Sequence, residues 1–206
     1  MVMAFWGAPL DDPNHAEHAV VGGFVMLKLT AQLREEFVAK NWPAIHVGIG
    51  INTGDMNVGD MGSEYRRAYT VLGDAVNLGS RLEGLTKFYG LEFLVSEFTA
   101  ELCPNIAFRP VDKVKVKGKD EAVAIFEPVC PKGELNDELV MELDLLKLAY
   151  QQYLKRHWQK AAEGYQQLIK LNPDKYLYQL YLERIDVLKE QDLDDNWDGS
   201  FTHTSK

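Results

Sequence analysis

The stretch that decides the fold begins His46-Val-Gly-Ile-Gly-Ile-Asn-Thr-Gly-Asp-Met-Asn-Val-Gly-Asp-Met-Gly62 and continues as Tyr69-Thr-Val-Leu-Gly-Asp-Ala-Val-Asn-Leu-Gly-Ser-Arg-Leu-Glu83. In the first half, apolar residues alternate with small or polar ones, which is typical of half-buried strands. We therefore predict a strand over residues 44–52 that turns at Thr53-Gly54-Asp55 and forms a β-hairpin with residues 56–59.

The second half changes its periodicity. A short strand over residues 69–72 is followed by apolar residues at helical spacing, which predicts a helix over 74–89 with Gly90 as its C-terminal stop. Asn77 and Arg81 are four residues apart on this helix, so both side chains project from one face.

Outside this stretch, the sequence predicts further strands and helices on both sides of a composition break at residues 128–137. Before the break we expect a helix over 15–40 and strands over 91–95, 108–116 and 122–128. After it we expect helices over 139–153, 158–171 and 176–190. We place the domain boundary there, giving domains 1–131 and 132–206. The first is predicted to be α/β (α+β) with a mixed or antiparallel sheet. The second resembles a single tetratricopeptide-type repeat, and a simple helical cap is the alternative.

The composition and net charge of the chain exclude some classes of function. The 206 residues are 46% hydrophobic and 26% charged, as in a soluble globular protein, and carry a formal net charge of −9. This charge repels a polyanion, so nucleic acid is not an expected partner. No apolar run approaches the roughly 18 to 20 residues that cross a bilayer, so we expect no membrane segment and a cytoplasmic location. Cys103 and Cys130 have no metal-ligand spacing.

The two segments quoted first, residues 46–62 and 69–83, resemble the catalytic domain of class III nucleotide cyclases, particularly bacterial adenylate cyclases. Met-Ala-Phe-Trp-Gly-Ala-Pro at 3–9 and Val-Lys-Val-Lys-Gly-Lys at 114–119 extend the resemblance over about residues 1–130. It implies a ferredoxin-like domain that converts ATP to 3′,5′-cyclic AMP and pyrophosphate with Mg²⁺ or Mn²⁺. It also implies a homodimer or heterodimer whose sites form at the subunit interface.

The resemblance assigns roles to four residues. Asn77 would orient the ribose and Arg81 would stabilise the transition state, whereas Thr70 would read the adenine and Lys117 would contact the polyphosphate. Each has a plainer interpretation. Arg81 could be a surface arginine paired with Glu83 or Asp74, Thr70 a β-branched residue that suits a strand, and Lys117 part of a solvated strand face.

Other polar residues of the stretch receive structural interpretations. We attribute Asp55 and Asp60 to turn chemistry. The glycines of residues 46–62 do not precede a helix as a dinucleotide fingerprint must, so we attribute them to the hairpin turn and to close strand approach across a dimer.

The sequence departs from the family at its start. Relatives carry one metal-binding aspartate on the first strand, and an adenine-selecting lysine and a second aspartate in Lys-x-x-Gly-Asp just before Met-Ala-Phe-Trp-Gly. We therefore expect the metal ligands, the first strand and the first helices to be absent from this chain. An adenylate cyclase that is truncated and inactive alone is one hypothesis. A non-catalytic partner that complements a full-length cyclase and a guanylate cyclase are the alternatives.

Overall fold

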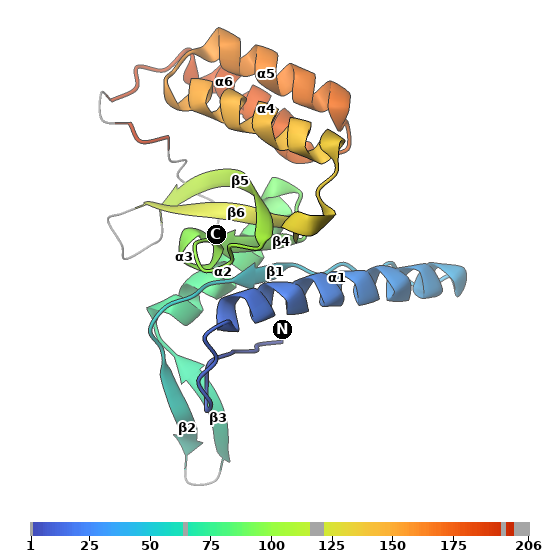
Figure 1. Ribbon diagram of the computed structural model, residues 1–206, viewed down its shortest axis with the longest axis vertical. Helices are drawn as coiled ribbons and strands as arrows, with labels where there is room; N and C mark the ends of the chain where they lie inside the picture. The colour runs from blue at the N-terminus through green and yellow to red at the C-terminus, as the bar shows by residue number, and fades with distance from the viewer. Residues whose placement is uncertain (1, 64–65, 116–121, 195–196, 200–206) are drawn as a thin grey trace. The chain divides into compact units, whose positions relative to one another are not determined.

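A computed structural model describes residues 2–63, 66–115, 122–194 and 197–199 (Figure 1). The chain divides into two compact units, the first comprising Met1–Lys87 and Glu92–Ile106 and the second Phe88–Leu91 and Ala107–Lys206. These units differ in their limits from domains 1–131 and 132–206, which stay a prediction. No helix among the described residues is both long and apolar enough to cross a membrane.

The first unit combines three helices with two pairs of strands. Its elements in chain order are α1 (His15–Ala39), β1 (Ile49–Ile51), β2 (Asn57–Ser63), β3 (Arg66–Leu72), α2 (Asp74–Tyr89), β4 (Phe93–Ser96) and α3 (Glu97–Ala100). β1 runs parallel to β4, with Gly50 opposite Leu94, and β2 runs antiparallel to β3. Parallel and antiparallel pairing within one chain confirms the predicted mixed α/β class.

The predicted hairpin between residues 44–52 and 56–59 is wrong. β1 pairs with β4, and the hairpin joins β2 to β3, with Val58 opposite Val71. Directly after β1, the Asn52 side chain bonds to α2 and to the end of β4: its amide donates to the Ala75 carbonyl over 2.9 Å, and its carbonyl oxygen accepts from Ser96 Oγ at 2.6 Å. Alternation with glycine over so short a run suits a parallel strand under a helix equally well, so the pattern alone could not identify the partner.

Glycines in β1 let helix α2 pack directly on the strand. A Cβ at Gly50 would lie 2.2 Å from the Glu83 backbone nitrogen and 2.3 Å from the Gly79 carbonyl oxygen. At Gly48 it would lie 2.4 Å from Thr86 Oγ1. The close approach for which these glycines are needed is therefore between β1 and α2 of the same chain.

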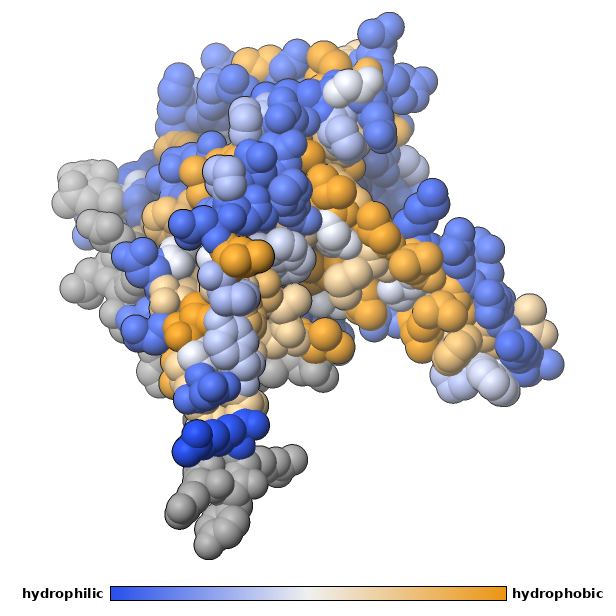
Figure 2. Space-filling model, turned by 60° about the horizontal axis from the view of Figure 1, so that its bottom comes forward, coloured by the Kyte–Doolittle hydropathy of each residue, from blue (hydrophilic) through white to orange (hydrophobic). Residues whose placement is uncertain are grey.

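Helix α1 presents apolar side chains on two faces. On one face, Ala16, Ala19, Val20 and Gly23 are buried, and the Phe24 ring meets the Phe93 ring edge-on at 5.8 Å between centroids. A second, exposed stripe runs along the helix at mostly four-residue spacing and consists of Val21, Val25, Met26, Leu29 and Leu33. Figure 2 shows orange surface along the projecting helix.

The second unit joins two strands to a layer of three helices. Its strands are β5 (Ile106–Lys115) and β6 (Ala122–Pro131), which are neighbours in a sheet; the short connection makes them antiparallel. After a 3₁₀ turn at Lys132–Glu134 come α4 (Asp137–Leu154), α5 (Trp158–Leu171) and α6 (Tyr176–Leu188). The sequence predicted all three helices to within two residues at each end.

Small residues bring α4 and α5 together. A Cβ at Gly164 would lie 2.7 Å from the Ala149 Cβ, so the two helices touch where both side chains are smallest. Beside this contact, the Tyr165 and Tyr181 rings stack at 4.8 Å between centroids, and both are fully buried. The resemblance of these helices to a tetratricopeptide-type repeat stays a prediction.

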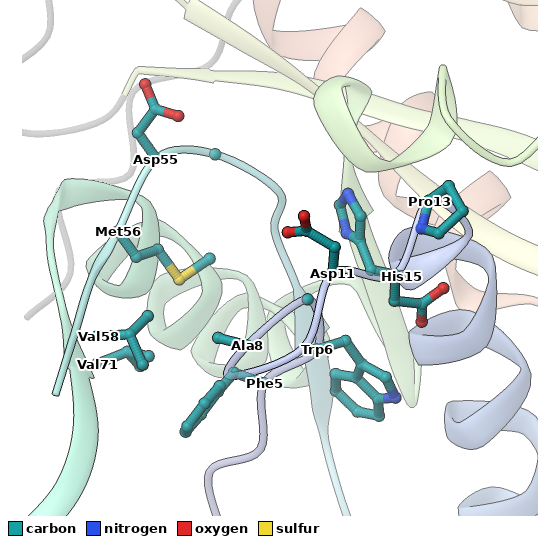
Figure 3. Close-up of a pocket in the computed structure, with 13 residues that line it drawn as sticks. Phe5, Trp6, Ala8, Asp11, Pro13, His15, Asp55, Met56, Val58 and Val71 are labelled. Atoms are coloured by element: carbon teal, nitrogen blue, oxygen red, sulfur yellow. The ribbon is translucent and has the colours of Figure 1, made fainter.

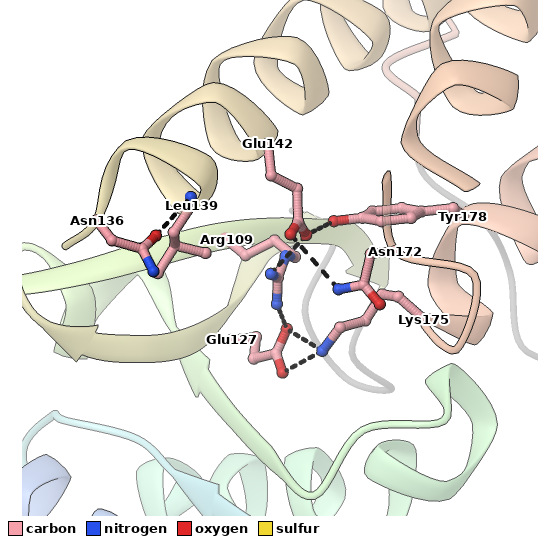
Figure 4. A network of polar contacts seen from close by, with 8 residues as sticks. All are labelled: Arg109, Glu127, Asn136, Leu139, Glu142, Asn172, Lys175 and Tyr178. Carbon is pink, nitrogen blue, oxygen red and sulfur yellow. Dashed lines mark hydrogen bonds and ion pairs between the residues drawn. The ribbon is translucent and has the colours of Figure 1, made fainter. Parts of the chain in front are cut away.

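Buried ions connect the helices of the second unit to its strands (Figure 4). Arg109 on β5 is paired with Glu127 on β6 and, over 2.7 Å, with Glu142 on α4. Glu142 also accepts hydrogen bonds from the Tyr178 hydroxyl and from Asn172. Lys175 completes the network by donating to Glu127 over 2.9 Å.

The network keeps Glu142 ionised. Burial alone would raise the pKa of this carboxyl group, but the hydrogen bond from Tyr178 and the positive charge of Arg109 outweigh burial and lower the pKa below its ordinary value. Burial and the neighbouring Glu142 raise the pKa of Tyr178, which therefore remains a protonated donor. The pair is thus a charged carboxylate with a neutral phenol.

Replacing Gly50 should disturb the packing of α2 on β1. Gly50→Ala places a methyl group against backbone atoms that cannot rotate away, so we expect a loss of about 1–3 kcal/mol in the free energy of unfolding, measured by denaturant titration. Gly84→Ala is the matched control, because a Cβ there meets nothing within 4 Å and alanine favours a helix. Equal free energies of unfolding for the two variants would contradict the close contact between β1 and α2.

Removing the Glu142 charge should change the response to acid. Because the folded pKa is lowered, the carboxylate stabilises the protein above the ordinary value of 4.5, and this contribution is lost as the pH falls through the folded pKa. Glu142→Gln should cost about 3 kcal/mol at pH 7 and flatten the acid limb of the stability profile. The control is Asp144→Asn, an exposed site on α4. An unchanged acid limb in Glu142→Gln would disprove the assignment.

Candidate functional site

Asn77 and Arg81 lie one turn apart on α2, and both side chains are exposed. The opposite face of the helix is buried through Leu78 and Leu82. A helix that is fixed on one side by β1 therefore offers an amide and a guanidinium together on the other side. This is the arrangement that the i and i+4 spacing predicted.

Thr70 is half-buried on β3, four residues before α2 begins. It lies directly opposite Gly59 on β2, so the two residues share one face of the hairpin. A Cβ at Gly59 would meet nothing within 4 Å, which leaves open space beside the threonine. The neighbouring pair on the same face is Asn57 with Leu72, whose side chain is largely exposed. Thr70 is thus a polar group on an accessible hairpin face.

Lys117, the residue that the resemblance assigns to the polyphosphate, lies outside the described residues. The structure therefore brings Thr70, Asn77 and Arg81 into one unit and does not place the fourth candidate.

The other face of the same hairpin borders a cavity of about 530 Å³ (Figure 3). Val58 and Val71 form its apolar wall, and the N-terminal segment contributes Phe5 and Trp6. Because side chains alternate along a strand, Val71 and Thr70 point to opposite faces. The cavity is therefore separate from the face that carries Thr70.

Acidic residues surround this cavity. Asp11 and Asp12 come from the segment before α1, and Asp55 comes from the segment between β1 and β2. In Figure 3 the Asp55 carboxylate points away from the cavity, whereas Asp11 and Met56 extend toward one another. A hydrogen bond with His18 over 2.8 Å lowers the pKa of Asp12 and keeps it ionised. Asp60, which we attributed to a turn, lies within β2 opposite Tyr69, so that interpretation is wrong.

These acidic residues do not make a metal site. Among the residues that the structure describes, no three His, Cys, Asp or Glu side chains lie close enough together to hold one ion. A two-metal centre needs several carboxylates around each pair of ions. The described residues therefore do not fit the Mg²⁺ or Mn²⁺ on which the cyclase family generally depends.

The structure adds supporting residues to those that the sequence identified. Asn52 connects the end of β1 both to the first turn of α2 and to Ser96 at the end of β4. Next to it, the Thr53 and Thr99 hydroxyls lie 3.0 Å apart. These bonds fix the first turn of α2, which carries Asn77. A polar residue directly after a half-buried strand was the signal in the sequence, but nothing in the pattern identified its partners.

Comparison with known proteins identifies the family of the chain. Residues 2–126 match the family described as the adenylate and guanylate cyclase catalytic domain. "Adenylate cyclase 1" of Rhizobium meliloti is 37% identical over 129 residues, which are 62% of this chain and 19% of that protein. The chain thus spans about a fifth of the length of this curated relative.

Solved cyclase structures share the fold. The adenylyl cyclase CyaB from P. aeruginosa superposes with a TM-score of 0.56 at 31% identity, covering 64% of this chain and 68% of that one. The guanylyl cyclase Cya2 superposes with a TM-score of 0.57 at 29% identity, covering 64% and 66%. With a family match over more than half of its length, this chain belongs to the adenylate and guanylate cyclase catalytic domain family.

Proposed function

We propose that this chain supplies the ribose and phosphate contacts of an adenylate cyclase, an enzyme that forms 3′,5′-cyclic AMP and pyrophosphate from ATP. One observation carries the proposal: Asn77 and Arg81 are presented together on the exposed face of a helix whose other face is fixed against β1. Catalytic groups act best when the scaffold holds them before substrate arrives.

The reaction explains why these two residue types are suited to the task. The ribose 3′-oxygen attacks the α-phosphorus, the bond to the pyrophosphate oxygen breaks, and negative charge shifts toward the leaving group. A guanidinium at Arg81 stabilises that charge with several donors. The Asn77 amide can donate to and accept from the sugar at once, so it holds the ribose in line for attack.

The substrate purine is proposed from Thr70. Its hydroxyl can donate to or accept from a ring nitrogen or an exocyclic amine, and the open space at Gly59 leaves room for a flat base on the same face. The matching residue differs in guanylate cyclases, according to the family resemblance, and this favours ATP. A guanylate cyclase remains the alternative substrate assignment, because Cya2 resembles this chain as well as CyaB does.

The second candidate function is that of a partner that completes a cyclase site without forming one alone. One observation favours it: the described residues hold no metal cluster. A family dimer can place metal ligands from one subunit opposite Asn and Arg from the other. In that arrangement this chain contributes Asn77 and Arg81, and a second cyclase polypeptide contributes the metal site.

Nucleotide binding should depend on the α2 pair. We expect Arg81→Ala to weaken binding of a fluorescent ATP analogue about tenfold or more, because a charged hydrogen bond to phosphate is worth about 1.5–3 kcal/mol. Asn77→Ala should weaken it by a smaller factor, since its partner is uncharged. Lys87→Ala, also exposed on α2, is the control and should bind as the unchanged protein does. Equal affinity in all four proteins would refute the site.

Activity should appear only in a mixture. Alone, the 206-residue protein should form no cyclic AMP from ATP with Mg²⁺ or Mn²⁺, because its described residues hold no metal cluster. We expect turnover when it is mixed with a family cyclase whose residue aligned with Arg81 has been replaced by alanine. The same mixture made with Arg81→Ala should stay inactive. Cyclic AMP formation by this protein alone, abolished by Arg81→Ala, would show that it has a complete site.

A further inference from the structure

The last residues of α2 belong to the second unit, whereas the rest of that helix belongs to the first. Tyr89, the final residue of α2, is fully buried, and its hydroxyl donates to Asp112 Oδ2 on β5 over 2.7 Å. Burial and the negative charge of Asp112 raise the pKa of Tyr89, so the phenol stays protonated and keeps donating. The end of the helix is thus anchored to a buried carboxylate.

Arg184 on α6 contacts the same place in two ways. Its Nη1 donates to Asp112 Oδ2 over 2.5 Å, so arginine and tyrosine share one carboxylate oxygen. Its guanidinium also lies 5.8 Å from the Phe88 ring centroid and 5.7 Å from that of Tyr89. Within the second unit, a C-terminal helix therefore touches the end of α2 both directly and through Asp112.

Two further bonds hold the parts of this contact in place. The other oxygen of Asp112 accepts from the Lys113 backbone N–H over 2.8 Å, which fixes the carboxylate. One turn before Arg184, the Tyr181 hydroxyl donates to the Val111 carbonyl over 2.6 Å, which fixes α6 on β5. Arg184 and Asp112 are both almost fully buried, so water does not screen their attraction.

From this geometry we propose that Arg184 and Asp112 are positioning residues for α2, through which the C-terminal helices hold the candidate catalytic pair Asn77 and Arg81. Arg81 lies eight residues before Tyr89, about two helical turns or about 12 Å along the axis. An α-helix moves as a stiff element over such a length, so fixing its end restricts the turns that precede it. The significance of Asn77 and Arg81 in this inference rests on the proposed function.

A purely structural role for Arg184 makes a different prediction. If the arginine only stabilises the second unit, its loss should loosen β5 and α6 and leave the first turns of α2 as they were. If it positions α2, the amides around Asn77 and Arg81 should become less protected while the protein stays folded. Local hydrogen exchange distinguishes these roles, because it reports opening segment by segment.

The test is amide hydrogen exchange with mass spectrometry on the full chain. In Arg184→Met we expect exchange over residues 76–84 to become at least tenfold faster, with β4 unchanged as the internal reference. Arg184→Lys keeps the charge and loses the contact of the guanidinium with the Phe88 and Tyr89 rings, so its exchange rate should fall between those of the unchanged protein and of Arg184→Met. Lys189→Met, at an exposed lysine just after α6, is the control and should exchange like the unchanged protein.

A second variant separates positioning from folding. Arg184→Met leaves a buried carboxylate unpaired, whereas Asp112→Asn/Arg184→Met removes both charges and keeps an acceptor for Tyr89. We expect the double variant to regain most of the lost melting temperature and still to exchange faster over 76–84. Normal exchange there in the folded double variant would overturn the proposal, as would global unfolding of every Arg184 variant.

Nucleotide titration keeps this inference distinct from the proposed function. If the unchanged protein binds the ATP analogue, Arg184→Met should weaken binding several-fold although Arg184 is outside the site. If the unchanged protein does not bind it, the proposed function fails, while faster exchange over 76–84 would still establish the anchoring of α2.

Discussion

The contact between helix α2 and strand β1 is the constraint on which the candidate site depends. At Gly50 the two backbones approach so closely that a methyl group would overlap Glu83 N and Gly79 O. This contact fixes one face of α2, whereas Asn77 and Arg81 lie exposed on the opposite face. The exposure of the candidate catalytic pair therefore depends in part on the absence of a side chain on the neighbouring strand.

Charges buried in the second unit complement this apolar contact. Arg109 lies between two carboxylates, and Arg184 faces Asp112. Such pairs add little net stability over apolar residues, yet losing one partner is costly because a buried charge remains. They therefore favour one arrangement of helices and strands over its alternatives. In this chain that arrangement includes the last turn of the helix that carries the candidate site.

The sequence predicted the helices well and the strand partners poorly. The bounds of α2 and α5 were predicted to the residue, because apolar spacing and stop signals are local. The partner of β1 was mistaken, since pairing is decided by residues distant in the chain, here β4. The roles of Asn77, Arg81 and Thr70 were predicted from their motif and stay a prediction, whereas the bonds of Asn52 to Ala75 and Ser96 could not be predicted. The charged residues Glu142 and Arg184 did leave a signal, because each occupies the buried stripe of its helix, where the periodicity calls for an apolar residue.

The ionic contacts of the second unit also affect whether the family domain could be combined with other C-terminal sequences. The family match ends at residue 126, inside β6, but the counter-charges of two buried residues on β5 lie beyond it: Glu142 for Arg109 and Arg184 for Asp112. A gene fusion that exchanged the helices after residue 131 for another sequence would leave a cation and an anion in the interior without these partners. Exchanging the C-terminal helices would therefore require compensating substitutions on β5, at Asp112 above all, because Arg109 keeps Glu127 on β6.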